Sequence, residues 1–383
     1  MQKKITFIST MGSFPWGGSE ELWANTAKQA INEGYAIQTI TFDWGFLSEK
    51  LQVLQKLGAE IVLRKRRITT SNNIIGKIKN KIYTELSSLL LPFPVKKLAK
   101  FNAEHIVISQ GGVYDFIGIN DLYNWLIENK KRYYLICQYN DEHRTLNEET
   151  ILKSIKILSN ATKVFFVSER NRIVTERQLC FKLTNSIIIS NPVNIDNTTI
   201  MEYPVEEGTI LFAQVARLDC NFKGQDILLH VLSATKWQSR DWHLNLYGQG
   251  PDESYIKNLS KFYHLEDKVS FCGHVNDIRE IWKVNHILLL PSLKEGTPLA
   301  LAEAMLCGRP AVVTDVGGNT ELIEENISGY IAEGANFISF DKALEKAWEN
   351  KSQWKELGIN AHVTMSNKVD HIPERALLTW IFQ

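Results

Sequence analysis

Two carboxylates eight residues apart, Glu295 and Glu303, are the side chains of this chain best suited to chemistry. Residues 297–306, around Glu303, are apolar on nearly every side, which is typical of a helix covered by protein all round. A lone carboxylate there is costly to bury unless something binds it. Thr297 is a candidate N-cap, and Pro298 suits the first helical position. Because a helix start is a good anion site, the pattern predicts phosphate and hydroxyl groups together, as in a nucleotide sugar.

Short apolar runs alternate with helical patterns along the whole chain, which predicts parallel, doubly wound α/β sheets. Several runs lack polar alternation, as strands buried on both faces should. The strands expected in a first sheet are 4–9, 36–42, 105–109, 133–137, 163–167 and 186–189. Those expected in a second sheet are 209–215, 243–247, 268–272, 286–290 and 310–315. Two such series predict two Rossmann-like domains that meet near residues 191–194.

Polar residues that directly follow the strands of the second series are candidates for a site, since open parallel sheets bind ligands at the ends of their strands. Arg217 and Lys223 follow the strand 209–215, and two cations can stabilise the charge of a departing diphosphate without a metal. An ordinary solvated loop is the alternative. The other candidates at strand ends are Gly248, Gly273, His274 and Val275. A lone Gly-x-Gly is more often a turn, and a histidine there is more often structural.

The string KEGTPLALAEAMLCGRPAVVTDVGGNTE, residues 294–321, resembles the Glu-x7-Glu signature of retaining glycosyltransferases, in particular glycosyltransferase family 4 (glycosyl transferases group 1) of the GT-B fold. The resemblance implies that Glu295 binds the donor sugar and that Glu303 binds the ribose hydroxyls. It implies that the backbone at the helix start holds the diphosphate, through Gly296, Thr297, Pro298 and Leu299. It also matches Arg217 and Lys223 to the family's phosphate cations, and the segment from Gly273 to Val275 to a contact with the base.

The N-terminal half resembles the family less closely. Gly17 and Gly18 resemble its Gly-Gly loop, and two glycines allow close backbone approach to a ligand. Trp16 beside them could stack on a sugar ring or simply pack. Many relatives carry a histidine after the fourth strand, close to the reacting sugar. That histidine is missing here, so Asn140 and His143 both remain candidates for its catalytic role.

The resemblance implies a domain of residues 1–197 that binds the acceptor, a nucleotide-sugar domain of 198–360, and a C-terminal helix, 361–383, that returns to the first domain. The 383 residues carry a formal net charge of zero, so composition favours no class of partner and we expect no nucleic acid to bind. The five cysteines form no Cys-x-x-Cys pair, which is typical of reduced thiols in a cytoplasmic protein. No apolar run approaches the ~20 residues needed to span a membrane.

These observations predict a retaining, metal-independent glycosyltransferase that moves a sugar from a nucleoside-diphosphate sugar to a hydroxyl of a glycan or lipid-linked acceptor, without a cofactor. A sugar-nucleotide epimerase and a non-catalytic subunit of the same fold are the alternatives. Residues 64–100 contain ten basic residues and one acidic residue, interleaved with apolar ones. Such a stretch suits an anionic membrane surface, although a solvated face or a groove for an acidic acceptor would look the same.

Overall fold

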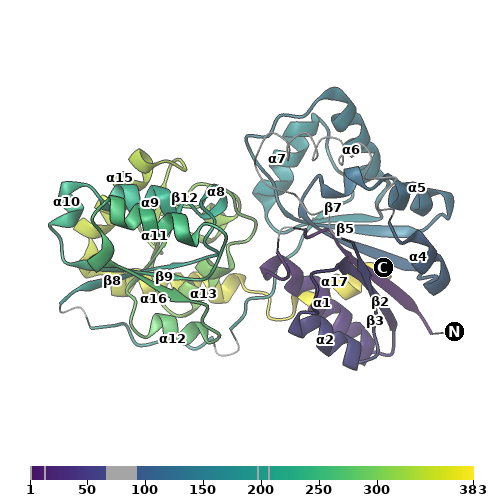
Figure 1. Cartoon of the computed structure of the whole chain (residues 1–383), viewed down its shortest axis with the longest axis horizontal. Helices are drawn as coiled ribbons and strands as arrows, with labels where there is room; N and C mark the ends of the chain where they lie inside the picture. The colour runs from purple at the N-terminus through teal and green to yellow at the C-terminus, as the bar shows by residue number, and fades with distance from the viewer. Residues whose placement is uncertain (1, 13, 66–92, 196–197, 206–207) are drawn as a thin grey trace. The chain divides into compact units, whose positions relative to one another are not determined.

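The computed structural model describes residues 2–12, 14–65, 93–195, 198–205 and 208–383, and it divides the chain into two compact units. The first unit comprises Met1–Pro192 and Ile372–Gln383, and the second comprises Val193–His371. Each unit is a parallel sheet covered by helices (Figure 1). The prediction of two Rossmann-like α/β domains is therefore confirmed.

Among the described residues, the first sheet has seven strands in the order β3-β2-β1-β4-β5-β6-β7, and every recorded pairing is parallel. Its strands are β1 Lys4–Ser9, β2 Ala36–Phe42, β3 Glu60–Arg64, β4 His105–Gly112, β5 Arg132–Tyr139, β6 Lys163–Phe166 and β7 Ser186–Ile188. Its α-helices are α1 Gly18–Asn32, α2 Glu49–Lys56, α4 Val95–Phe101, α5 Asn120–Glu128, α6 Glu148–Asn160, α7 Glu169–Leu179 and α17 Pro373–Phe382. The order reverses direction between β1 and β4, where ligands of such sheets commonly bind.

The second sheet, counted over the same described residues, has six strands in the order β10-β9-β8-β11-β12-β13. Its strands are β8 Ile210–Val215, β9 Trp242–Tyr247, β10 Val269–Gly273, β11 Ile287–Leu290, β12 Ala311–Thr314 and β13 Tyr330–Ala332. Its α-helices are α8 Cys220–Lys223, α9 Gln225–Leu232, α10 Thr235–Gln238, α11 Glu253–Phe262, α12 Ile278–Trp282, α13 Leu299–Leu306, α14 Asn319–Leu322, α15 Phe337–Glu349 and α16 Trp354–Lys368. Strands β11 and β12 are buried along their whole length, which fits their unbroken apolar sequences.

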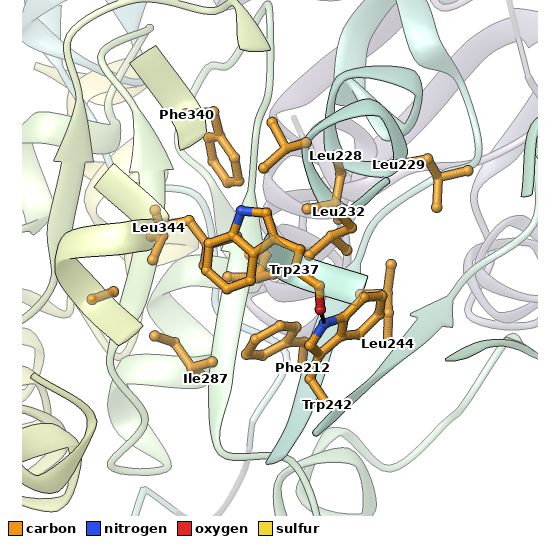
Figure 2. Close-up of a cluster of buried hydrophobic side chains, with 14 of the residues drawn as sticks. Phe212, Leu228, Leu229, Leu232, Trp237, Trp242, Leu244, Ile287, Phe340 and Leu344 are labelled. Carbon is orange, nitrogen blue, oxygen red and sulfur yellow. Dashed lines mark hydrogen bonds between the residues drawn. The ribbon is translucent and has the colours of Figure 1, made fainter. Parts of the chain in front are cut away.

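An aromatic cluster anchors one face of the second sheet (Figure 2). Trp237 and Trp242 are both buried, and Trp242 Nε1 donates a hydrogen bond to the carbonyl of Trp237 at 2.6 Å. Phe212 of β8 stacks on Trp242 with ring centroids 5.9 Å apart. The indole polar atom is thus satisfied inside the core, as a buried tryptophan requires. This packing fixes the position of β8, whose carboxyl end leads into the candidate site.

The unit boundaries differ from those expected from the sequence. The first unit ends at Pro192 rather than residue 197, because Val193 and Ile195 pack into the core beneath α13. The returning segment starts at Ile372 rather than residue 361, because helix α16 packs on α13 within the second unit. Of the helices in the segment 361–383, only α17 belongs to the first unit. It packs against α1, and the backbone carbonyl of its residue Ile381 accepts a hydrogen bond of 2.8 Å from Tyr134 Oη.

Two edge strands, β3 and β13, were not predicted. Strand β3 has one fully buried residue, Val62, and β13 is three residues long. Edge strands have one sheet neighbour and carry weaker apolar patterns than central ones. Most of the basic segment, 66–92, lies outside the described residues. Arg64, at its start, stacks its guanidinium 3.7 Å from the ring centre of Phe42 and donates to the carbonyl of Ser9.

Candidate active site

Lys223 and Glu295 meet at the carboxyl edge of the second sheet. Lys223 Nζ lies 2.6 Å from Glu295 Oε1, and the same oxygen accepts a hydrogen bond of 2.7 Å from Ser292 Oγ. The Glu295 side chain is 6% exposed and that of Lys223 is 23% exposed. Charges held at this depth are screened less by salt than surface charges. Two residues 72 positions apart therefore form one preorganised charged group.

The backbone around Lys223 is held by a glycine that no other residue could replace without strain. Gly224 has φ +62°, and a Cβ there would lie 2.1 Å from the carbonyl oxygen of Pro291. Gln214 of β8 donates a hydrogen bond of 2.8 Å to the carbonyl of Lys223. The lysine thus starts from a fixed backbone position beside the loop that carries Glu295.

A second glycine packs directly beneath Glu295. Gly317 has φ +50°, and a Cβ there would lie 2.2 Å from the carbonyl oxygen of Glu295. The next residue, Gly318, donates its N–H to the carbonyl of Gly296 at 2.8 Å. The Gly-Gly pair of the sequence string therefore holds the Glu295–Gly296 backbone, a role that needs no contact with a ligand.

Arg217 lies in a loop that closely approaches two further glycines. Its side chain forms an ion pair with Asp219, and its carbonyl accepts a hydrogen bond of 2.9 Å from Gln225 Nε2. A Cβ on Gly248 or Gly250 would lie 2.1 or 2.2 Å from the carbonyl oxygens on either side of Arg217. The Gly-x-Gly turn thus supports the arginine loop. Because Arg217 is already paired with Asp219, an incoming phosphate would compete with that carboxylate.

Helix α13 starts one residue later than expected. Thr297 is not its N-cap and Pro298 is not its first residue: Pro298, with ψ 91°, is the N-cap, and Leu299 is the first helical residue. The carbonyl of Pro298 accepts the amides of Leu301 and Ala302. Because the ψ of Pro298 is not helical, Pro298 takes the N-cap position and Thr297 lies one residue further out. The first amides of the helix have no acceptor within it, so this end can still bind an anion.

Glu303 lies inside α13 and is 5% exposed. Burial raises the pKa of its carboxyl to about 8, opposed by a hydrogen bond from the backbone of Asn194. The expectation of a lone buried carboxylate is met, since no charged group contributes to that shift. A carboxyl group in this state can donate to and accept from sugar hydroxyls.

The segment after β10 is partly exposed. Gly273 has φ +68° with open space around its Cβ position, and its carbonyl accepts the amide of Gly248 at 2.7 Å. His274 is exposed, whereas Val275 packs against the core that contains α13. The backbone of Gly273 and His274 is therefore accessible at the same sheet edge.

In the first unit, the Gly-Gly loop forms the start of α1. Gly17 is the N-cap and Gly18 the first helical residue, and a Cβ on Gly17 would lie 2.4 Å from the ring of Phe14. The indole of Trp16 donates a hydrogen bond of 2.7 Å to Glu21 and packs 5.8 Å from Trp23. These contacts favour packing as the role of Trp16.

The two candidates for the missing histidine differ in their surroundings. Asn140 is buried, and its Nδ2 donates to Thr175 Oγ1 and to Gln178 Oε1, both at 2.9 Å. Its amide is thus used to hold the loop after β5 onto α7. His143 is exposed and lines an open hollow of about 330 Å³ together with Arg144 and Arg177. Of the two, only His143 has a side chain that solvent reaches.

Within the described parts of the chain, no three His, Cys, Asp or Glu side chains are grouped so that they could hold a metal ion. A search of the same residues finds no helix that is long and apolar enough to cross a membrane.

Comparison with known proteins finds a family whose model covers the residues of this site. Residues 197–364 match the family described as "Glycosyl transferases group 1". An uncharacterized glycosyltransferase of Haemophilus influenzae is 26% identical over 368 residues, which cover 93% of each chain. The solved structure of Anabaena Alr3699/HepE in complex with UDP has a TM-score of 0.71 at 16% identity, over 98% of both chains. A TarM variant of S. aureus, solved with fondaparinux, alpha-GlcNAc-glycerol and UDP, has a TM-score of 0.72 at 15% identity, over 100% of both chains.

The chain is a glycosyltransferase of the GT-B fold. Sequence reasoning singled out Lys223 and Glu295, which the structure brings together, but missed Ser292, which shares Glu295 Oε1 with Lys223. Its position three residues before the glutamate, in the turn after β11, was the available signal. It also missed Asp219, whose pairing with Arg217 is typical of a short loop with both charges.

Proposed function

We propose that this glycosyltransferase transfers a sugar from a UDP-sugar to a hydroxyl of a glycan or lipid-linked acceptor, with retention of configuration and without a metal ion. The observation that carries the proposal is the Lys223–Glu295–Ser292 group beside the start of α13. A cation and free helix amides suit a diphosphate, and a buried carboxyl suits hydroxyl groups. The UDP bound by HepE and TarM supports uracil as the base.

In the proposed reaction, the acceptor oxygen bonds to the anomeric carbon as the bond from that carbon to the phosphate oxygen breaks. The acceptor proton passes to the departing phosphate, so no protein nucleophile is needed. Lys223 and Arg217 stabilise the diphosphate, Glu295 orients the sugar, and Glu303 binds the ribose. Retention is implied by the family resemblance, since the acceptor attacks on the face that the leaving group departs from.

Thermal-shift titration with UDP, GDP and ADP tests the donor assignment, because a ligand that binds only the folded state raises apparent stability. We expect the largest shift with UDP, and loss of that shift in Lys223→Ala. Product analysis with and without an acceptor then separates the alternatives. An epimerase would convert the UDP-sugar alone, and a non-catalytic subunit would bind it without turnover.

We also propose that residues 64–100 bring the enzyme to an anionic membrane surface on the cytoplasmic side. The support is the local charge of 10 − 1 = +9 in a chain of zero net charge, since each basic residue near such a surface is worth about 1 kcal/mol. Co-sedimentation at low salt with neutral and anionic vesicles tests it. Equal recovery with both, or no effect of reversing Lys77, Lys79 and Lys81 to glutamate, would contradict it.

A further inference from the structure

A narrow slot opens at the carboxyl ends of β1 and β2 in the first unit, and the residues that line it are not among those assigned above to the donor. Its cavity volume is about 10 Å³, which admits one water-sized group. Among the side chains that line it are Trp16, Glu20, Thr41, Phe42, Trp44 and Phe46. Polar groups thus lie among aromatic walls, the composition typical of small-molecule sites.

The polar lining is buried and offers more hydrogen bonding than the described residues use. Glu20 is 4% exposed, and burial raises the pKa of its carboxyl to about 7, opposed mainly by a hydrogen bond with the side chain of Ser9. Thr41 is 7% exposed, and its Oγ1 finds no hydrogen-bond partner among the described residues. Such a buried hydroxyl costs about 1–3 kcal/mol until a partner arrives. Its presence at the slot points to a polar ligand.

Two of the aromatic residues that line the slot, Trp44 and Phe46, belong to a hydrogen-bonded turn after β2. Gly45, at φ +81°, separates Trp44 from Phe46, and its amide donates to Asp43 Oδ1 at 2.9 Å. Phe46 is 59% exposed, although it is a large apolar side chain. The turn therefore presents an aromatic surface to solvent next to the slot.

We propose that the Trp44–Phe46 turn and the slot beneath it form a saccharide subsite, in which one sugar ring of the acceptor lies on the aromatic surface and one of its hydroxyl groups enters between Thr41 and Glu20. A sugar ring has both an apolar face and hydroxyls that donate and accept, which matches this pairing of surfaces. A purely apolar ligand would leave Thr41 Oγ1 unpaired, and an anion would approach the Glu20 and Glu21 carboxyls. That the bound sugar belongs to the acceptor rests on the proposed function, whereas the binding of a sugar here does not.

Saturation-transfer NMR on the full chain tests the subsite, with the methyl α- and β-glycosides of glucose, galactose and N-acetylglucosamine as probes. We expect at least one glycoside to bind the wild type. We expect Phe46→Ala and Thr41→Val each to weaken that binding at least fivefold, and Phe46→Trp to restore it. Thr41→Val removes an unpartnered hydroxyl, so it should fold at least as well as the wild type. Phe262→Ala, which removes a 74% exposed aromatic from α11, is the matched control and should bind as the wild type does.

UDP titration of the same proteins keeps the two proposals distinguishable. If the wild type binds a glycoside but does not bind UDP, the donor assignment is overturned and the subsite is supported. Absence of saturation transfer to all six glycosides, or unchanged binding in both Phe46→Ala and Thr41→Val, would overturn the subsite whatever UDP does.

Discussion

The two units place polar groups at the same edge of similar sheets, but they use them differently. In the second unit, Lys223 and Glu295 lie on separate loops and contact each other directly. Glycines pack against those loops so closely that a Cβ would meet backbone oxygen. In the first unit, Asn140 and Trp16 also follow strands, but their side chains donate hydrogen bonds that hold loops onto neighbouring helices. Lys223 and Glu295 thus form a rigid charged group, the proposed donor cradle, whereas the loops of Asn140 and Trp16 serve mainly structure.

This difference shows where fixed geometry is required. A diphosphate has the same shape in every nucleotide sugar, so backbone and charges can be fixed around it in advance, which is how electrostatic stabilisation becomes efficient. An acceptor varies from enzyme to enzyme, and exposed groups such as Phe46 and His143 can vary with it. The first unit should therefore tolerate changes that the second does not.

The largest effect is expected from removing the cation of the donor cradle. Lys223→Ala should lower kcat for transfer by about 10²-fold or more, because it removes a charge aimed at the leaving group; Glu303→Ala should likewise abolish most transfer. Steady-state transfer of sugar from a UDP-sugar measures this. Lys257→Ala is the control, since Lys257 forms an exposed pair with Glu253 in the same unit. Turnover within threefold of wild type in folded Lys223→Ala would contradict the donor site.

The central strands could be predicted from the sequence, and the residues proposed for the donor site could be singled out from it, because their signals are local. Strands β1 and β2 are apolar runs whose bounds match the prediction, and Glu295 lies in a dense string of glycine and proline. The start of α13 was misplaced because Thr297 and Pro298 are both good cap residues, and only the ψ of Pro298 decides between them. The contact of Lys223 with Glu295, 72 residues away, and the slot at Thr41 depend on tertiary packing, which leaves no periodic pattern in the sequence.

Stability should depend on pH through the buried carboxyl of α13. Burial raises the pKa of Glu303 to about 8 from its ordinary 4.5, so between these values the native state holds a proton that the unfolded state releases. Stability contributed by this group is therefore full below pH 4.5 and is lost as pH rises towards 8. Glu303→Gln cannot ionise, so its free energy of unfolding relative to that of the ligand-free wild type should grow by about 3–4 kcal/mol from pH 5 to pH 8. Urea unfolding at both pH values measures this, and a constant difference would contradict the shift.

The glycines beneath the arginine loop should be sensitive to a single methyl group. Gly250→Ala places a Cβ 2.2 Å from the carbonyl oxygen of Leu218, and overpacking of this kind costs about 1–3 kcal/mol. We expect lower unfolding free energy and weaker UDP binding, because the loop that carries Arg217 must move. Gly118→Ala in the first unit, where a Cβ meets nothing within 4 Å, is the control. Equal stability of the two variants would show that the close approach is not required.

The smallest effect is expected from removing metal ions. Transfer should survive dialysis against EDTA, because Lys223 and Arg217 supply the positive charge that a divalent ion would otherwise bring to the diphosphate. The measurement compares initial transfer rates in EDTA, in Mg²⁺ and in Mn²⁺, with Lys223→Ala assayed in parallel. Rates within twofold for the wild type are expected. If only the lysine variant gains activity from added metal, the ion replaces the missing cation, and the assignment of Lys223 to the diphosphate is supported. A strict metal requirement in the wild type would instead mean that these two side chains do not suffice to stabilise the leaving group.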